Sequence, residues 1–246
     1  MKNLKTTFGK SKVSQSQKTK MVQDVFTDVT KNYDLMNNLM SFGAHRLWKR
    51  KLIQLINIQP NDLIVDVGSG TGAITNLIHK NYSKTSIISI DLNFNMLKHG
   101  KKRVKYKSNK IFWVNCNAEN LPLKKNIFDK YIISFCLRNI THIENALYEA
   151  IRVLKPGGSF YCLEFSTPMS PFINGVYNFY KSKIIPLIGE RVAKNKEAYK
   201  YLEESIDQFP NQKILLSKLN QIGFENTSVI NLFNGIVSIH TGFKIL

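Results

Sequence analysis

The sequence has few cysteines, no clustered histidines and no long apolar run, and each shortage excludes a class of protein. The three cysteines, Cys116, Cys136 and Cys162, form no C-x-x-C pair, so we expect neither a disulfide framework nor a cysteine zinc site. The five histidines show no H-E-x-x-H or similar spacing, and we predict no metal site. No apolar run reaches the roughly 20 residues of a membrane-spanning helix, and the N-terminus lacks the apolar core of a secretory signal.

Acidic side chains are also scarce. The 246 residues include 35 Lys and Arg against 17 Asp and Glu, which gives a net charge of +18. This charge attracts nucleic acid, anionic lipid and phosphorylated substrates alike, and it does not choose among them. A coding bias toward lysine would produce the same excess, so the charge alone assigns no partner. We expect a cytoplasmic protein, or one of the mitochondrial matrix if the source is eukaryotic.

Three regions follow one another along the chain. Residues 1–20 carry many lysines and no acidic residue, which predicts a flexible basic arm. Residues 21–59 place apolar side chains at helical spacing and predict a cap of two or three short helices. Residues 60–246 form one domain, because no repeat or low-complexity linker divides them. Within this domain we expect a helical insert at about 168–208 that covers the substrate.

Short apolar runs alternate with helical patterns in the main domain. The runs lie at 63–67, 86–90, 111–114, 131–134 and 159–165. Because parallel strands need a covering helix at each crossover, this alternation predicts a doubly wound α/β sheet. The chain ends differently. Two apolar-rich segments, 226–233 and 235–246, are joined through Asn234-Gly235, a hairpin signal that places an antiparallel strand at the sheet edge.

The stretch "VDVGSGTG" ends the first of these strands and opens a helix. Its glycines, Gly68, Gly70 and Gly72, let a ligand approach the backbone, and the free N–H groups at the helix start favour a polar or negative group. A tight turn that needs glycine is the other interpretation. Asp91 follows the second strand, where a carboxylate can accept both ribose hydroxyls of an adenosine. Alternatively, Asp91 caps the helix predicted over 93–102.

The glycine loop reads G-x-G-x-G, whereas a dinucleotide fingerprint reads G-x-G-x-x-G. It resembles the S-adenosylmethionine loop of class I methyltransferases. Three further segments follow in the order of that superfamily: "NAENLP" after the third strand, "FDKYIIS" as the fourth, and "VLKPGGSFY" leading into the fifth. The resemblance implies a Rossmann-like class I methyltransferase sheet of seven strands, the last one antiparallel, with an N-terminal helical extension.

Longer segments resemble one family, the ubiquinone/menaquinone biosynthesis C-methyltransferases of the UbiE type. The similar segments are "VFTDVTKNYDLMNNLMSFGAHRLWKR", "FCLRNIT", "VLKPGGSFYCLEFSTP", "YKYLEESIDQFP" and "NLFNGIVSIHTGFK". The match extends from about Phe8 to Lys244, nearly the whole chain. Because "FGKSKV" also resembles family sequence, we expect an intact bacterial protein rather than one with a cleaved organellar leader.

The resemblance implies S-adenosylmethionine as cofactor. Its contacts fall on Gly68, Gly70, Thr71, Asp91, Asn117, Ala118 and Ser134. Two positions depart from the family, since Cys136 replaces a usual glycine beside the site and Thr241 replaces a common arginine. A side chain at position 136 either narrows the pocket or packs against the sheet. Asp66, in the first motif, either orders the loop or meets the amine of the cofactor.

The implied substrate is a lipid-soluble polyprenyl benzoquinol or demethylmenaquinol, methylated on a ring carbon. Arg138 and Asn139 lie just past the fourth strand, where doubly wound folds bind ligands. We assign them catalytic roles: Arg138 holds a developing phenolate or a water that accepts the proton, and Asn139 orients that group by hydrogen bonding. The alternative is that Arg138 pairs with an acid and Asn139 caps a helix. Tyr33 and His45 are assigned to substrate binding, and with His240 they are candidates for proton handling.

The N-terminal stretch from Tyr33 to Arg50 is expected to fold over the carboxyl edge of the sheet and cover the cofactor. Its apolar wall for the ring would consist of Tyr33, Met36, Met40, Phe42 and Trp48. The insert offers a second wall along one helical face, with Phe172, Val176, Phe179, Tyr180 and Ile184. Aromatic edges beside basic side chains favour contact with an anionic membrane. The sequence does not determine whether the protein forms a homodimer.

Two other functions stay open as well. A methyltransferase of the same fold could act on another substrate such as RNA, although the chain shows no separate aromatic-and-basic recognition module and no Asn-Pro-Pro-Tyr motif. A non-catalytic cofactor-binding scaffold of a quinone-synthesis complex is the other alternative. The arguments against a scaffold are the residues Thr71, Asp91, Arg138 and Asn139.

Overall fold

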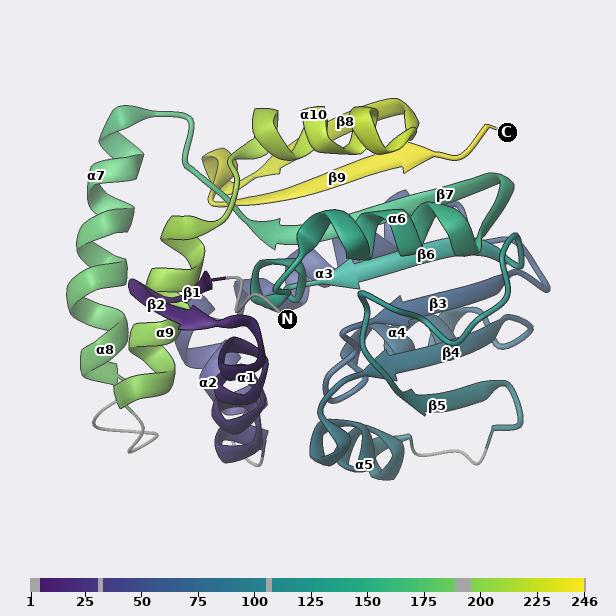
Figure 1. The fold of residues 1–246 in the computed structure, drawn as a ribbon, viewed down its shortest axis with the longest axis horizontal. Coiled ribbons are helices and arrows are strands. Elements are labelled where there is room, and N and C mark those ends of the chain that lie inside the picture. Colours follow the sequence, from purple (N-terminus) through teal and green to yellow (C-terminus); the bar gives the residue numbers. More distant parts are fainter. Residues whose placement is uncertain (1–4, 31–32, 105–107, 189–195, 246) are drawn as a thin grey trace.

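The computed structural model describes residues 5–30, 33–104, 108–188 and 196–245. Figure 1 shows a central sheet with helices on both faces and a cluster of helices beyond one end of its strands. Among the residues so described, no helix is both long enough and apolar enough to cross a membrane.

Seven strands of the described chain form the central sheet. They are β3 (Leu63–Val67), β4 (Ser86–Asp91), β5 (Ile111–Asn115), β6 (Phe128–Ser134), β7 (Leu154–Phe165), β8 (Glu225–Leu232) and β9 (Val237–Phe243). Their order across the sheet is β5-β4-β3-β6-β7-β9-β8. The first five in this order are parallel to one another, whereas β9 is antiparallel to both β7 and β8. The predicted doubly wound α/β sheet is confirmed.

The predicted C-terminal hairpin is confirmed, and it places antiparallel pairing at the edge of the sheet. The turn η5 (Phe233–Gly235) joins β8 to β9, and Asn234 and Gly235 in it have φ values of 58° and 90°. β9 pairs with β7 along seven residues, from Ser159↔Phe243 to Phe165↔Val237. Because β9 takes the place next to the parallel strands, β8 becomes the edge strand and antiparallel β9 lies one strand inward.

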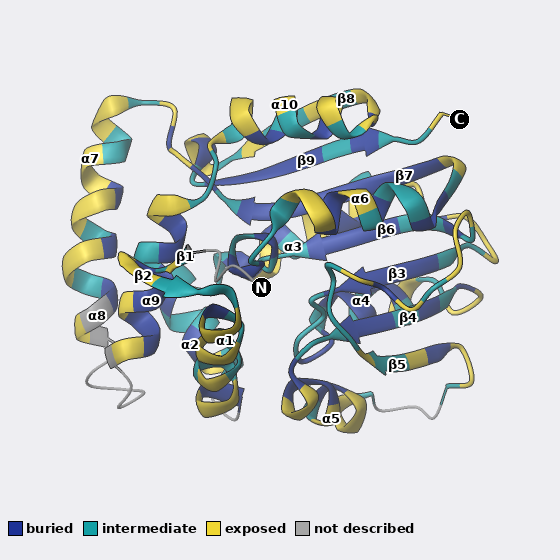
Figure 2. Cartoon of the chain, in the orientation of Figure 1, coloured by how far each residue is buried: buried dark blue, intermediate teal, exposed yellow. Residues whose placement is uncertain are grey.

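Helices cover both faces of the sheet. They are α3 (Ala44–Leu55), α4 (Ala73–Asn81), α5 (Phe94–Arg103), α6 (Ile143–Val153) and α10 (Gln212–Ile222). Because successive strand residues point to opposite faces, Ile64 and Ile132 pack with α3 and α4, whereas Val65 and Ile133 pack with α6 and α10. Figure 2 shows the buried strands between these partly exposed helices. Two apolar layers therefore hold the sheet in place.

The strand order reverses at β3. β4 and β5 lie on one side of β3, whereas β6 and β7 lie on the other. Doubly wound sheets bind ligands in the crevice beyond the carboxyl ends of their strands at such a reversal. The glycine loop after β3, Asp91 at the end of β4 and the segment after β6 therefore meet in one place.

A cluster of helices lies beyond the carboxyl ends of the strands, on the left of Figure 1. This helical cap consists of α1 (Gln15–Val29), α2 (Tyr33–Ser41), α7 (Pro171–Phe179), the π-helical turn η3 (Tyr180–Ile184), α8 (Ile185–Ile188) and α9 (Lys196–Gln208). Its apolar core contains Val29, Met36, Met40, Ile185 and Tyr199. The helices predicted before the main domain and those predicted in the insert thus pack against each other.

Helix α3 departs from the predicted cover, because it packs on a face of the sheet. Trp48 of this helix is 5% exposed, and its ring lies 5.7–6.1 Å from the rings of Phe135, Phe165 and Phe233. Phe42, at the turn before α3, is 80% exposed. Two residues of the predicted apolar wall therefore lie elsewhere, Trp48 in the core of the sheet and Phe42 at the surface.

The prediction of a flexible basic arm is wrong for the described residues 5–20. β1 (Lys5–Phe8) and β2 (Ser11–Ser14) form an antiparallel hairpin, and Ser14 then caps α1 through reciprocal hydrogen bonds with Gln17. The hairpin lies on α9, where Phe8 stacks on Tyr201 with ring centroids 4.3 Å apart. Contacts with a helix far along the chain order a segment whose composition alone favours disorder.

Candidate active site

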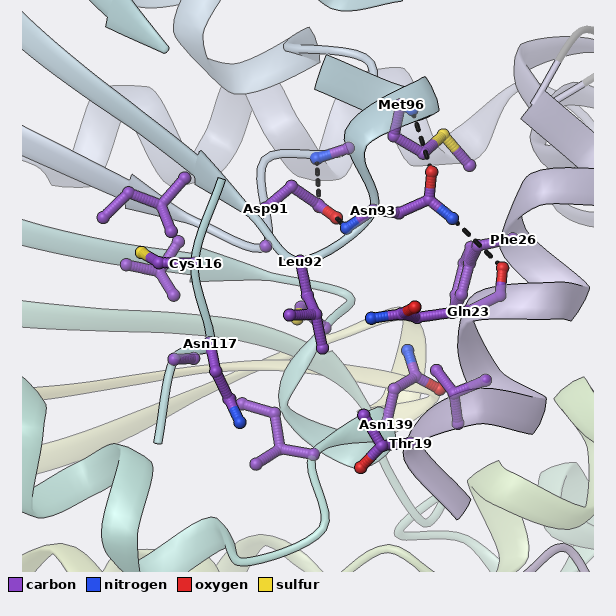
Figure 3. Close-up of a pocket in the computed structure, with 18 of the residues that line it drawn as sticks. Thr19, Gln23, Phe26, Asp91, Leu92, Asn93, Met96, Cys116, Asn117 and Asn139 are labelled. Atoms are coloured by element: carbon purple, nitrogen blue, oxygen red, sulfur yellow. Dashed lines mark hydrogen bonds between the residues drawn. The ribbon is translucent and has the colours of Figure 1, made fainter. Parts of the chain in front are cut away.

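A cavity lies where the carboxyl ends of β3, β4 and β6 meet helix α1. This loop pocket encloses about 810 Å³ of empty space, part of it open to solvent. Its wall includes the predicted residues Gly68, Gly70, Asp91, Asn117, Ala118 and Asn139. Helix α1 supplies another wall through Thr19, Gln23 and Phe26 (Figure 3). The glycine loop and the acid after the second strand thus border one cavity.

Asp91 holds the glycine loop from the end of β4. One carboxylate oxygen accepts the backbone N–H of Gly70 at 2.8 Å, and the other accepts that of Asn93 at 2.8 Å. Burial raises the pKa of Asp91 to about 6, although both of these hydrogen bonds oppose the rise. Because each carboxylate oxygen has more than one acceptor site, both can still accept hydroxyl groups from a ligand.

Asn93 connects the loop pocket to α1 and is absent from the predicted site. Its Oδ1 accepts the N–H of Met96, so Asn93 rather than Asp91 caps α5. Its Nδ2 donates to the carbonyl of Gln23 at 3.0 Å and to Thr27 Oγ1 at 2.8 Å, and Figure 3 places Asn93 between the loop and α1. The cap signal is visible in the sequence, whereas the contact with α1 depends on the fold.

The departure at Cys136 shapes the loop pocket. Cys136 lines the pocket, and a Cβ added at Gly68 would lie 2.1 Å from its Sγ. Gly68 also has a φ of +65°, so the position needs glycine both for the turn and for the approach of residue 136. Both alternatives for Cys136 hold, since its side chain packs against the apolar layer of the sheet and also lines the cavity.

Three residues of the predicted motifs turn away from the loop pocket. Thr71 is buried and accepts a hydrogen bond from Arg103 Nη1 at 3.2 Å. Ser134 Oγ is buried without a partner among the described residues. Asp66 Oδ2 accepts from the N–H of Thr75 at 3.1 Å and from its hydroxyl at 2.6 Å, and burial raises the pKa of Asp66 to about 6. Asp66 therefore orders the start of α4, in line with the first of its two predicted roles.

A second cavity, the helix pocket, lies next to the loop pocket. It encloses about 620 Å³ of empty space, part of it open to solvent, and both pockets have Phe26, Tyr33 and Phe135 in their walls. Its lining comes from α1, α2, α3 and α9 and from the ends of β6 and β7. His45 lines it as well, so both predicted substrate residues, Tyr33 and His45, border this cavity.

The two pockets differ in charge. The charged residues that line the loop pocket are Asp91 and Glu119, both acidic. Those that line the helix pocket are Lys49 and Arg138, with His45 as a third basic side chain. The arrangement therefore offers a site for a cationic ligand beside a site for an anionic one.

Arg138 pairs with an acid, which is the alternative considered for it from the sequence. Its Nη1 lies 2.8 Å from Glu164 Oε1 and 2.7 Å from the carbonyl of Phe135. The Arg138 and Glu164 side chains are 6% and 0% exposed. Burial raises the pKa of Glu164, and the Arg138 guanidinium opposes that rise. Arg138 still lines the helix pocket, and its Nε has no partner among the described residues. It can therefore interact with a ligand.

Glu164 is a residue that the predicted site lacks. Its only sign in the sequence is a charged residue inside the apolar run "FYCLEF", which indicates a buried partner without naming it. Glu164 also accepts the backbone N–H of Phe165 at 2.9 Å and that of Arg138 at 3.3 Å. It therefore sets both the backbone and the side chain of the segment that follows β6.

Asn139 does not cap a helix. Helix α6 begins after His142, which makes no side-chain cap bond, whereas Asn139 Oδ1 accepts a hydrogen bond from the Tyr201 hydroxyl at 3.1 Å. Asn139 lines the loop pocket, and Tyr201 lines the helix pocket. The short helix η2 (Leu137–Asn139) thus presents its two predicted catalytic residues to neighbouring cavities.

Helix α3 brings two basic groups to the helix pocket. His45 Nδ1 lies 2.9 Å from Ser41 Oγ, and burial, followed by the charges of Lys49 and Arg46, lowers the pKa of His45 to about 4. Lys49 is absent from the predicted site. Among the described residues its ammonium group makes no hydrogen bond or ion pair that would neutralise it, and burial lowers its pKa against the opposing charges of Asp34 and Asp66.

His240 and Thr241 lie on β9, away from both pockets. His240 is 1% exposed, its Nε2 lies 3.0 Å from the carbonyl of Gln212, and burial lowers its pKa to about 4. The Thr241 hydroxyl lies 2.7 Å from that of Ser228 on β8. The structure therefore gives no support to proton handling by His240, and Thr241 is part of the strand pairing.

Comparisons with known sequences agree with the resemblance. The sequence profile of the ubiE/COQ5 methyltransferase family matches residues 12–244. A protein of Wigglesworthia glossinidia brevipalpis named ubiquinone/menaquinone biosynthesis C-methyltransferase UbiE is 42% identical over 99% of this chain and 99% of its own. A protein of Oryza sativa subsp. japonica named 2-methoxy-6-polyprenyl-1,4-benzoquinol methylase, mitochondrial, is 41% identical over 98% of this chain and 88% of its own.

Solved structures share the fold at low sequence identity. A SAM-dependent methyltransferase from Aquifex aeolicus has a TM-score of 0.60 and 14% identity, with 80% of this chain and 89% of that one covered. Phosphoethanolamine N-methyltransferase 2 of Haemonchus contortus in complex with S-adenosyl-L-methionine has a TM-score of 0.60 and 14% identity, with 80% and 52% covered. These likenesses support the class I methyltransferase arrangement of the sheet.

Proposed function

The chain belongs to the ubiE/COQ5 methyltransferase family, and from that premise we propose that it methylates a ring carbon of a polyprenyl quinol, with S-adenosylmethionine as methyl donor. The names of its relatives point to a polyprenyl benzoquinol or a demethylmenaquinol. The observation that carries the proposal is the pair of adjoining pockets with opposite charge. The donor is a sulfonium cation and the reactive quinol is a phenolate, so each reactant meets a pocket of opposite sign.

The loop pocket fits an adenosyl cofactor. Gly68 and Gly70, with φ values of +65° and +55°, let the backbone come close to a ligand. Asp91 would hold the ribose hydroxyls, and Asn117 borders the same cavity. When bound, the cofactor supplies a methyl group on a positively charged sulfur. The acidic lining formed by Asp91 and Glu119 favours that charge.

The helix pocket fits the quinol ring. Met36, Met40 and Phe135 offer apolar surface, and Lys49 and Arg138 offer positive charge. A ring carbon becomes a good nucleophile when the neighbouring phenol loses its proton, so the site must stabilise a phenolate. Donors fixed in a pocket that excludes water stabilise such an anion strongly. Glu164 already compensates Arg138, so Lys49 is the cation more available to the phenolate.

Arg138 and Asn139 act from different pockets. Arg138, held by Glu164, orients the phenolate oxygen from the wall of the helix pocket. Asn139, held by Tyr201, orients the reacting groups from the wall of the loop pocket. Tyr33 lies in both walls and borders the place where the cofactor and the ring meet. Most of the catalysis comes from positioning and from the exclusion of water.

Methylation of a defined quinol tests this proposal. Purified protein is incubated with S-adenosylmethionine and a short-chain demethylmenaquinol, and the methylated product is measured. We expect turnover that falls sharply in Arg138→Ala, while cofactor affinity stays unchanged. Cofactor binding without turnover on any quinol would favour a non-catalytic scaffold. Methylation of RNA instead of a quinol would favour a methyltransferase that acts on another substrate. A strain that lacks the gene should accumulate a precursor without one ring methyl group. Identifying that precursor in a lipid extract would show which pathway the protein serves.

We also propose that the protein works at the surface of an anionic membrane, in the cytoplasm or the matrix. The outer face of α7 carries Phe172, Val176 and Phe179, which are 77%, 55% and 62% exposed, and Lys183 continues this stripe at helical spacing with an exposed charge. Figure 2 shows the exposed residues along α7 at the edge of the molecule. An apolar stripe with basic neighbours suits an anionic bilayer, where the polyprenyl chain lies.

Flotation with anionic liposomes tests the membrane proposal. We expect salt-sensitive binding that a double variant, Phe172→Ser with Phe179→Ser, reduces several-fold. Phe112→Ser is the matched control, because Phe112 is also exposed, at 52%, but lies on the edge strand β5, outside the helical cap. Equal binding by the double variant and the control would reject α7 as the contact.

A further inference from the structure

A chain of hydrogen bonds fixes the protonation of His45. Ser41 Oγ donates to the carbonyl of Asn37 at 2.6 Å, and a carbonyl can only accept. A hydroxyl has one proton and two acceptor sites, so Ser41 Oγ must accept at its remaining contacts. These are the His45 backbone N–H at 3.2 Å and His45 Nδ1 at 2.9 Å. His45 Nδ1 therefore carries the ring proton, and Nε2 carries a free lone pair.

That lone pair belongs to a neutral imidazole in the helix pocket. His45 lines the pocket, and its Nε2 makes no hydrogen bond among the described residues. Burial and the charges of Lys49 and Arg46 lower its pKa to about 4, against the opposing effects of a backbone hydrogen bond with Asn37 and of the Asp34 charge. Arg138, Tyr33 and Tyr201 face the same cavity from η2, α2 and α9. At physiological pH, His45 is therefore an uncharged base, and the proposed reaction has so far given it no role.

The other titratable groups of the pocket are less suited to act as a base. Arg138 stays protonated and paired with Glu164. Tyr33 and Tyr201 have pKa values raised by burial, so both are neutral acids rather than bases. Lys49 is the cation placed to stabilise the phenolate. Among the described lining residues, His45 is thus the side chain that has an uncharged nitrogen with a free lone pair.

The proposed reaction needs such a base after the new bond has formed. The ring carbon that has accepted the methyl group carries that methyl together with its original hydrogen, and the ring has lost its aromaticity. Breaking the C–H bond returns its electron pair to the ring and restores aromaticity, and the proton passes to a base. Because aromaticity is regained, this proton is strongly acidic, and a base as weak as a buried imidazole is sufficient.

We propose that His45 Nε2 is the catalytic base that removes this ring-carbon proton, with Ser41 as the positioning residue that fixes its tautomer. The proposal rests on the proposed function, since it requires a quinol ring in the helix pocket. The proton then leaves His45 for water at the pocket opening. The imidazole returns to its neutral form before the next turnover.

A substrate deuterated at the carbon to be methylated tests the role of His45. In the unaltered protein we expect equal kcat for the two isotopologues, because proton loss follows the slow methyl transfer. In His45→Asn we expect kcat about 100-fold lower and a several-fold isotope effect, because proton loss becomes limiting. The asparagine amide can still donate to Ser41, and His45→Gln, which places an amide at the Nε2 position, should behave alike.

Controls separate this role from a structural one. Ser41→Ala should lower kcat by less, on the order of tenfold, because the tautomer is then free to change, and cofactor affinity should stay the same in all variants. A His45 variant without an isotope effect overturns the proposal, and an isotope effect in Lys49→Arg instead assigns the proton to Lys49. If the unaltered protein binds S-adenosylmethionine but methylates no quinol, the proposed function itself fails and the proposal fails with it.

Discussion

The loop pocket and the helix pocket share a wall but are built in opposite ways. The loop pocket is lined by the segments that follow the strands and by one side of α1, and its charged residues are acidic. The helix pocket is lined by side chains from helices, and its charged residues are basic. Methyl transfer from a sulfonium to a phenolate removes both charges in one step. Two neighbouring cavities of opposite sign can therefore hold both reactants apart from water without placing one charge beside its like.

The largest expected effect comes from breaking the ion pair behind the helix pocket. Glu164→Gln leaves the Arg138 guanidinium buried without its carboxylate, because both side chains are almost fully buried. We expect a loss of about 3–5 kcal/mol in the free energy of unfolding, measured by urea titration, and a large loss of quinol methylation. Affinity of the loop pocket for S-adenosylmethionine, measured by calorimetry, should change little.

Glu149→Gln is the matched control for Glu164→Gln. Glu149 also pairs with an arginine, Arg152, at 2.6 Å, but those two side chains are 16% and 36% exposed. Solvent screens such a pair, so the expected loss of stability is about 0–1 kcal/mol. Equal losses of unfolding free energy in the two variants would show that burial does not determine the cost of removing the carboxylate. The electrostatic difference between the two pockets would then not be supported.

The next effect is expected in the loop pocket. Gly68→Ala adds a Cβ 2.1 Å from Cys136 Sγ at a residue with φ +65°, so strain and overpacking act together at about 1–3 kcal/mol each. We expect S-adenosylmethionine affinity to fall at least tenfold by calorimetry. Adding Cys136→Gly should recover the packing part alone. Gly175→Ala, where nothing lies within 4 Å, is the control, and in helix α7 it should be neutral or stabilising.

The loop pocket is also the part of the site that the sequence predicts best. Gly68, Gly70 and Asp91 stand next to recognisable apolar runs, and parallel strand ends meet at one edge of a sheet. The same motif misleads for Thr71, whose hydroxyl bonds with Arg103 instead of lining the cavity. A motif determines the path of the backbone, whereas tertiary packing determines where a side chain points.

The helix pocket is predicted only in part, because Tyr33, His45 and Arg138 line it as expected. Lys49, Glu164 and Tyr201 come from α3, β7 and α9, and they reach this part of the molecule only after the sheet order and the packing of the cap are set. Their sequence neighbourhoods contain no spacing that relates one to another. The N-terminal hairpin is unpredictable for the same reason, because its order depends on the stacking of Phe8 on Tyr201.

A smaller effect follows from the pKa of Asp91 and sharpens the difference between the pockets. The free protein has an Asp91 pKa of about 6, and only the ionised carboxylate accepts two ribose hydroxyls. Affinity for S-adenosylmethionine should therefore be flat above pH 7 and about tenfold weaker at pH 5, since the ionised fraction falls tenfold per unit below the pKa. Calorimetry at pH 5, 6 and 7 measures this dependence.

Asp91→Asn is the control for that titration. It should bind weakly and without the pH dependence, because no carboxylate remains to ionise at that position. Asp66 also has a pKa of about 6, so a dependence that persists in Asp91→Asn would belong to Asp66 and the start of α4. His45 in the helix pocket has a pKa of about 4 and should contribute little to the change between pH 5 and pH 7.

The smallest expected effect tests the hydrogen bond between the two pockets. Tyr201→Phe removes the donor to Asn139 Oδ1 at 3.1 Å but keeps the ring that stacks on Phe8. Loss of one buried hydrogen bond costs about 1 kcal/mol, so we expect a lower free energy of unfolding and a several-fold lower kcat with unchanged cofactor affinity. Tyr199→Phe, on the same helix, removes a buried hydroxyl without a partner among the described residues and should cost nothing. A kcat that falls in Tyr201→Phe alone means that the orientation of Asn139 matters to the reaction, whereas equal falls in both variants would assign the effect to the packing of α9.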